Sequence, residues 1–173
     1  MGGHWTDIES ASFRAYELNQ METLVSIATS HGAHLDLLTM PCMDSGFAEG
    51  DPPGPSDSQQ RRALYNGMLR QVAAEHPSSV SVVDYGSVMC TTGTFAQFLN
   101  GVQVRTPDGV HTPAYLPGNI FGNNSPEAVA NAFDSWLSPR LWPLLLDTLR
   151  PAAANPPEPL SSRPATNALA AAG

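Results

Sequence analysis

The chain is poor in basic residues and contains no long apolar run. Of its 173 residues, 8 are Lys or Arg and 16 are Asp or Glu, which gives a formal net charge of −8 at pH 7. This balance repels a phosphate backbone, so we expect no nucleic-acid partner. The most apolar stretch, residues 141–149, is interrupted by Pro143 and Asp147 and is too short to cross a bilayer. The N-terminus also lacks the basic and apolar regions of a signal peptide.

Cysteine is scarce as well. Cys42 and Cys90 lie far apart, with no Cys-x-x-Cys spacing and no third or fourth cysteine, so we expect no zinc site. Each follows a predicted strand closely. If those strands are parallel neighbours, both thiols lie at one edge of the sheet, within reach of a disulfide. Two unrelated buried thiols are the alternative; we favour the disulfide, which implies an oxidising compartment. No cofactor is expected.

An acid and a histidine lie three residues apart in the stretch Arg105-Thr106-Pro107-Asp108-Gly109-Val110-His111. A carboxylate that accepts from one ring nitrogen of a histidine fixes its tautomer and leaves the other nitrogen free to take a proton from a nucleophile. Gly109 allows a turn tight enough for the two side chains to converge. Asp108 and His111 are therefore candidate catalytic residues. The same spacing also occurs in a plain turn capped by the aspartate, and this structural interpretation stays open.

The apolar spacing predicts helices alternating with strands, which indicates an α/β fold with parallel strands joined by right-handed crossovers. The expected order is a helix at 12–31, a strand at 35–40, a loop at 47–57, a helix at 58–75, a strand at 80–85, a hairpin turning at Asn100-Gly101, a helix beginning at Ser125-Pro126-Glu127 and a last apolar segment at 141–149. We expect one domain over residues 1–150. Residues 151–173 are rich in alanine, proline and serine and are expected to form a disordered tail.

Several short fragments match one family in order along the chain. They are Gly3-His4-Trp5, Gly32-Ala33, Pro41-Cys42, Asn66, Val82-Val83-Asp84, Cys90, Val104-Arg105 and Asp108-Gly109-Val110-His111. The ordered set resembles the SGNH (GDSL-type) hydrolase superfamily, in particular the SGNH domain fused to membrane acyltransferases of acyltransferase family 3. The resemblance runs from Gly3 to about Leu149, and Asp-Gly-Val-His is its sharpest part.

This resemblance implies a flavodoxin-like three-layer α/β/α fold with a parallel sheet of about five strands. It also implies acyl transfer by a Ser-His-Asp mechanism, with His111 as the general base, Asp108 as its orienter and Cys42–Cys90 as a disulfide. The implied partners are an acyl donor, a cell-surface glycan that accepts the acyl group, and an upstream membrane acyltransferase region. The implied location is the extracytoplasmic face of the cell membrane.

The chain departs from the family pattern at its front. The Gly-Asp-Ser motif that carries the nucleophile is absent, so we expect a sheet that is incomplete on its N-terminal side. Gly3 matches a family glycine, but the Gly-x-Asn-Asp oxyanion motif is missing, and Trp5 or Thr6 stands near its asparagine. Ser45, in Asp-Ser-Gly, is a conceivable replacement nucleophile, although a turn explains that motif better.

Two functions remain open. The first is the C-terminal part of an acyltransferase or esterase domain that lacks its nucleophile. The second is a non-catalytic module that binds a glycan or a partner on the same scaffold, with Trp5, Phe95 and Phe98 as candidate aromatic contacts. An incomplete sheet also exposes an unpaired edge, so we expect self-association.

Overall fold

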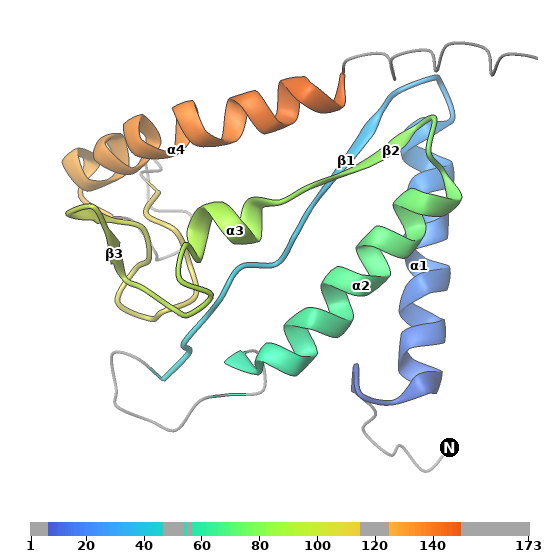
Figure 1. The fold of residues 1–173 in the computed structure, drawn as a ribbon, viewed down its shortest axis with the longest axis horizontal. Coiled ribbons are helices and arrows are strands. Elements are labelled where there is room, and N and C mark those ends of the chain that lie inside the picture. The colour runs from blue at the N-terminus through green and yellow to red at the C-terminus, as the bar shows by residue number, and fades with distance from the viewer. Residues whose placement is uncertain (1–6, 47–53, 55–56, 115–124, 150–173) are drawn as a thin grey trace, which may run out of the picture.

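The computed structural model describes residues 7–46, 54, 57–114 and 125–149 (Figure 1). Its elements are α1 (Ala11–Thr29), β1 (Leu35–Leu38), α2 (Gln59–Glu75), β2 (Val80–Val83), α3 (Tyr85–Met89), β3 (Phe98–Leu99), β4 (Val102–Gln103) and α4 (Glu127–Thr148). The chain is an α/β protein, as predicted, with a short parallel sheet. In the part of the chain that is described, no helix combines the length and apolarity needed to span a membrane. The tail expected at 151–173 and most of the loop expected at 47–57 lie outside the described residues.

β1 and β2 pair in parallel, with Leu35 opposite Val80 and Leu38 opposite Val83. Helix α2 connects them, which is the crossover that the helix–strand alternation predicts. Because side chains alternate across a strand, Leu35, Leu37 and Val82 share the face that packs against α1 and α2. The buried residues of this core are Met21, Val25, Met68, Leu69, Val72 and Val80.

Helix α4 lies on the opposite face of the sheet. The Thr148 hydroxyl donates to the Asp36 carboxylate at 3.1 Å, and Asp36 alternates with the core-facing leucines of β1. Further toward its N-terminus, α4 buries Phe133 and Trp136 in a second cluster with Met89 and Val104. This second cluster fixes the β3–β4 hairpin and the loop that follows it.

The serines before the first two long helices act as caps. Ser10 Oγ accepts from the Phe13 amide, and Ser58 Oγ accepts from the Arg61 amide, both at 3.3 Å. The prediction that Ser125 caps the last helix was wrong, because α4 has Pro126 as its N-cap and makes no side-chain capping bond. Instead, the Ser125 amide donates to the Ala114 carbonyl at 2.9 Å.

Two other boundaries also differ from those expected. Residues 141–149 are not a separate segment, because α4 continues through Pro139 and Pro143 to Thr148. Both prolines are exposed and four residues apart, so water can reach the carbonyls that lose their helical donors. Tyr85 does not end β2 but begins α3, because Asp84 accepts from the Ser87 amide as an N-cap.

The hairpin turn and the disulfide are confirmed. Asn100 and Gly101 have φ angles of 52° and 78° between β3 and β4, the left-handed values that a tight Asn-Gly turn requires. Cys42 and Cys90 form a disulfide, with Cα atoms 5.9 Å apart; Cys42 lies in the loop after β1, and Cys90 directly follows α3. The flavodoxin-like sheet of about five strands stays a prediction, since the described sheet consists of β1 and β2.

Candidate functional site

The loop after β4 folds back on itself to bring Asp108 and His111 together. The Thr106 amide donates to the His111 carbonyl at 2.8 Å, and the Gly109 amide donates to the Thr106 carbonyl at 3.0 Å. Gly109 has a φ of 71°, a left-handed conformation that a side chain would strain. The glycine thus permits the convergence that the sequence suggests.

The two oxygens of Asp108 have separate partners. Oδ1 accepts from the Thr106 hydroxyl at 2.5 Å and from the amides of Val110 and His111 at 2.9 and 3.1 Å. Oδ2 contacts Nδ1 of His111 at 2.6 Å. One oxygen therefore closes the turn and the other orients the imidazole. The aspartate-capped turn and the candidate acid–histidine pair are both present, and neither excludes the other.

Asp108 stays ionised over a wide pH range. Burial would raise the pKa of this carboxyl, but the hydrogen bonds from Thr106, from the His111 ring and from two backbone amides outweigh it. Together they hold the pKa of Asp108 far below its usual range. An ionised Asp108 accepts only from an Nδ1 that carries a proton. The pair therefore favours the tautomer of His111 in which Nε2 is unprotonated and able to accept.

The His111 side chain reaches the surface. The His111 side chain is 57% exposed and that of Asp108 is 42% exposed. Within the described residues, no hydrogen bond reaches Nε2. The arrangement supplies a candidate base and its orienter on a largely exposed side chain.

Arg105, directly before the loop that carries Asp108 and His111, is buried, which the sequence did not predict. Arg105 is 1% exposed; its Nη1 donates to the Val104 carbonyl and its Nη2 to the Cys42 carbonyl, at 3.1 and 3.4 Å. Burial lowers the pKa of Arg105 and raises the pKa of Tyr85, with which its side chain interacts. Among the described residues, Nε of Arg105 has no hydrogen-bond partner. No sequence signal separates such a buried arginine from the solvated kind.

Ser45 lies close to this loop along the backbone but is engaged elsewhere. The amide of the preceding Asp44 donates to the Gly109 carbonyl at 3.2 Å. The Ser45 hydroxyl, however, donates to Asp57 Oδ2 at 2.8 Å, and its amide donates to Asp57 Oδ1 at 3.0 Å. The Asp-Ser-Gly motif thus fastens the start of a loop to Asp57.

Other candidate positions fall outside the part of the chain that the structure describes. Gly3, Trp5 and Thr6, considered for the oxyanion hole or a glycan contact, lie outside the described residues. In the described part of the chain, no group of three or more His, Cys, Asp or Glu side chains is arranged to hold a metal ion.

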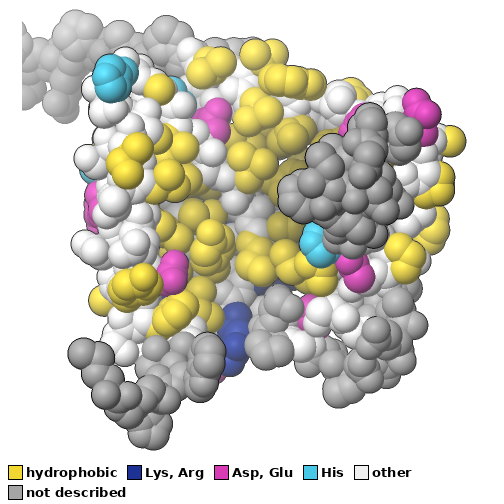
Figure 2. Space-filling view, turned by 180° about the vertical axis from the view of Figure 1, so that it is seen from behind, with side chains coloured by type: hydrophobic (Ala, Val, Ile, Leu, Met, Phe, Trp, Pro, Cys, Tyr) yellow, Lys and Arg dark blue, Asp and Glu magenta, His cyan; other side chains and the backbone are white. Residues whose placement is uncertain are grey.

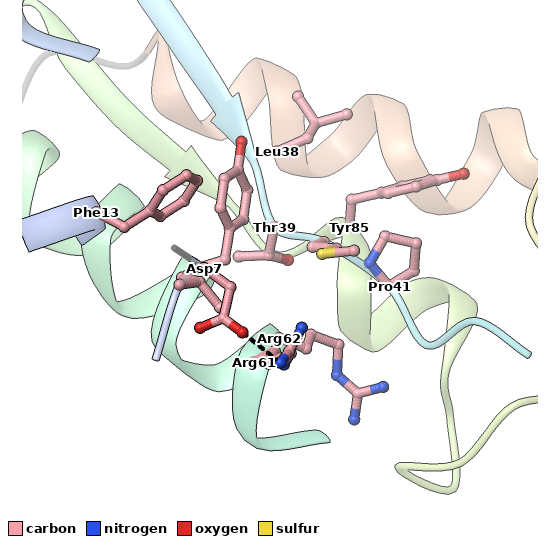
Figure 3. Close-up of a pocket in the computed structure, with 11 residues that line it drawn as sticks. Asp7, Phe13, Leu38, Thr39, Pro41, Arg61, Arg62 and Tyr85 are labelled. Atoms are coloured by element: carbon pink, nitrogen blue, oxygen red, sulfur yellow. Dashed lines mark hydrogen bonds and ion pairs between the residues drawn. The ribbon is translucent and has the colours of Figure 1, made fainter. Parts of the chain in front are cut away.

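A separate apolar cavity of about 680 Å³ opens at the C-terminal end of β1 (Figure 3). Its lining includes neither Asp108 nor His111. The labelled side chains come from α1 and the turn before it, from β1 and the residues directly after it, and from α2 and α3. Arg61 closes one side by pairing with Asp7 at 2.6 Å. The cavity lining residues are Asp7, Ile8, Phe13, Leu38, Thr39, Met40, Pro41, Arg61, Arg62, Tyr65 and Tyr85.

Comparison with known proteins adds no relative to this picture. No family model matches the chain, and neither the curated proteins nor the solved structures contain a match to it.

Proposed function

We propose that this chain carries the general base and its orienting carboxylate for acyl transfer, as the C-terminal part of an SGNH-type O-acyl (acetyl) transferase or esterase domain. His111 is the base, through Nε2, and Asp108 is the orienter. The observation that supports the proposal is the 2.6 Å contact between His111 Nδ1 and Asp108 Oδ2. The accompanying fold is flavodoxin-like and three-layered, and the parallel β1–β2 pair with helices on both faces corresponds to part of it.

In this mechanism a serine from outside the described residues attacks an ester carbonyl while His111 Nε2 takes its hydroxyl proton. The imidazolium, stabilised by Asp108, then gives that proton to the departing alcohol. Water or a sugar hydroxyl next attacks the acyl-serine, gives its proton to Nε2 and receives the acyl group, while the imidazolium returns a proton to the departing serine oxygen. The proposed acceptors are cell-surface glycans outside the cytoplasm, and the Cys42–Cys90 disulfide is consistent with an oxidising compartment.

The first test is hydrolysis of p-nitrophenyl acetate by the purified chain beside His111→Ala and Ser45→Ala. Because the Ser45 hydroxyl donates its hydrogen bond to Asp57, we expect no turnover above that of the two variants. Turnover that both substitutions abolish would instead identify Ser45 as the nucleophile. The complementary test adds any coding sequence that lies upstream in frame. A longer protein that contains Gly-Asp-Ser should hydrolyse the ester, and His111→Ala should abolish that activity. An unchanged rate in that variant would refute the role of His111.

The orienting role of Asp108 has its own readout in the tautomer of His111. Nitrogen NMR should show the proton on Nδ1 in the wild-type chain, because an ionised carboxylate at 2.6 Å can only accept. Asp108→Ala removes the acceptor that holds the proton on Nδ1, so the Nε2-protonated tautomer should become populated. An Nε2-protonated ring in the wild type would contradict the proposal. Asp134→Ala, on the exposed side of α4, is the matched control.

The alternative is a non-catalytic module that binds a glycan or a partner on the same scaffold. The observation in its favour is that Phe98, at the start of β3, is 55% exposed. Sugar binding that depends on Phe98 and is indifferent to His111→Ala would support it.

A further inference from the structure

None of the most exposed residues of α1 is charged, although the chain has a net charge of −8; the charged residues Arg14, Glu17 and Glu22 of this helix are half-buried. A helix that faces water ordinarily presents charged side chains on its exposed side. Helix α2 does so, with Arg70 and Glu75 on its exposed side. The exposed residues of α1 are Ala11, Ser12, Ala15, Tyr16, Asn19, Gln20, Thr23, Leu24, Ser26 and Ile27. This composition is typical of a covered surface.

Within that side, large apolar residues form a row. Tyr16, Leu24 and Ile27 are 58%, 49% and 69% exposed, and their spacing places them on one face of the helix. Figure 2, seen from behind Figure 1, has α1 on the left and α4 along the top. Apolar side chains gather there from one helix across the hollowed middle to the other. Contiguous patches of this kind mark interaction sites.

β1 presents an unpaired edge beside this row. The amides of Leu35 and Thr39 donate to the carbonyls of Ser79 and Val83 at 2.8 and 3.0 Å, so alternate residues of the strand face β2. The backbone groups of Asp36 and Leu38 therefore point away from β2, to the outer edge. Leu38 is also 41% exposed. Within the described sheet, no strand pairs with this edge.

The helix on the other face of the sheet, α4, also exposes apolar side chains near this edge. The last turns of α4, which reach β1 through the Thr148–Asp36 bond, expose Trp142, Leu146 and Leu149. An open strand edge thus has an apolar helix on each side of it.

We propose that this surface, formed by the α1 row, the outer edge of β1 and the end of α4, binds a second copy of the chain. A two-fold axis perpendicular to the sheet places two β1 strands antiparallel and keeps each helix on its own face. Each α1 then packs against the other α1, and each α4 end against the other α4 end. The groups that face outward set the register: Asp36 pairs with Leu38 of the second copy, and Leu37 lies opposite its own counterpart.

A second copy suits this surface because it can supply a strand for the open edge of β1 and apolar side chains for α1 and α4. It offers a strand edge whose outward donors and acceptors have no partner in the described part of the chain, and an apolar helix on each face. The most exposed side chains of α1 are uncharged, which limits like-charge contacts between two chains of net charge −8. In the proposed register each Asp36 lies opposite a leucine and not opposite the other Asp36.

Sedimentation equilibrium of the full chain tests the proposal over a range of concentrations. We expect a dimer that dissociates on dilution. Ile27→Lys, at the most exposed position of the row, should yield a monomer, and so should Leu24→Lys. Ala63→Lys, on the exposed side of α2, is the matched control and should stay dimeric. Circular dichroism shows whether each variant is folded.

Hydrogen exchange of the β1 amides identifies the interface independently. In the dimer the amides of Asp36 and Leu38 should be protected, and in Ile27→Lys they should exchange fast while Leu35 and Thr39 stay protected. A wild-type chain that is monomeric at every concentration overturns the proposal. A dimer that survives both α1 variants, with fast exchange at Asp36 and Leu38, overturns it as well, because the copies then meet elsewhere.

Discussion

Asp108 carries two tasks because a carboxylate has two oxygens. Oδ1 holds the turn through three donors, and Oδ2 holds the imidazole of His111. Neither task excludes the other, and the rigid turn makes the orientation of the ring more definite. An aspartate held in this way is already in place to keep the proton of His111 on Nδ1, which a histidine base requires.

Its depressed pKa predicts how stability depends on pH. A carboxyl whose pKa is lower folded than unfolded contributes stability that is fully present above the unfolded value, about 3.9, and is lost as pH falls toward the folded value. Asp108→Asn should therefore lower the free energy of unfolding at neutral pH, and this loss should shrink below about pH 4. Urea unfolding from pH 7 downward measures the effect. Asp134→Asn is the control, and a loss from Asp108→Asn that does not change with pH would contradict the linkage.

At the scale of elements, side chains at the ends of strands and helices hold the ends of β1 and β2 against α2 and α3. Thr39, directly after β1 and 1% exposed, donates to Asp84 and accepts from the Gly86 amide, at 2.9 and 2.8 Å. Asn66 of α2 holds the next residue, Met40, through both its amide and its carbonyl. The ends of β1 and β2 are thereby joined to α2 and α3, just before the disulfide.

Helix capping gives a prediction at the same scale. Ser58→Ala removes the side chain that accepts from the Arg61 amide, so α2 should lose about 1 kcal/mol of stability. Ser125→Ala should cost clearly less, because α4 makes no side-chain capping bond. Thermal or urea unfolding of the two variants compares them directly. Equal losses would mean that Ser125 contributes in another way.

At the scale of the whole molecule, the loop after β1 is held against later segments of the chain. The Cys42–Cys90 disulfide joins this loop to the end of α3, and the Asp44 amide joins it to Gly109. Arg105 adds a bond to the Cys42 carbonyl from the chain just before the site. The candidate site therefore depends on contacts between segments distant in the sequence.

The disulfide should contribute a large share of the stability. It closes a separation of 48 residues, for which chain entropy gives about 4 kcal/mol. The double variant Cys42→Ser, Cys90→Ser should unfold at a much lower urea concentration than the oxidised wild type. The reduced wild type should resemble the variant. If oxidised and reduced chains unfold alike, the bond does not form in solution.

The sequence by itself determined the features that depend on neighbouring residues. Apolar spacing placed α1, β1, α2 and β2 within a few residues of their bounds, and Asn100-Gly101 specified its turn, because the backbone preferences involved are local. The Asp-x-x-His spacing likewise sufficed to bring Asp108 to His111.

Only the tertiary structure decided what depends on distant segments. The sequence left Ser45 open, and its engagement by Asp57 appears only once the loop is closed. Arg105 is buried because Cys42 and Tyr85 pack around it. Ser125 is no cap because α4 has Pro126 at that position, and the Ser125 amide instead bonds to the Ala114 carbonyl. The continuity of α4 through two prolines depends on which side of the helix faces water. Burial and long-range pairing are properties of the folded chain, and a linear pattern does not carry them.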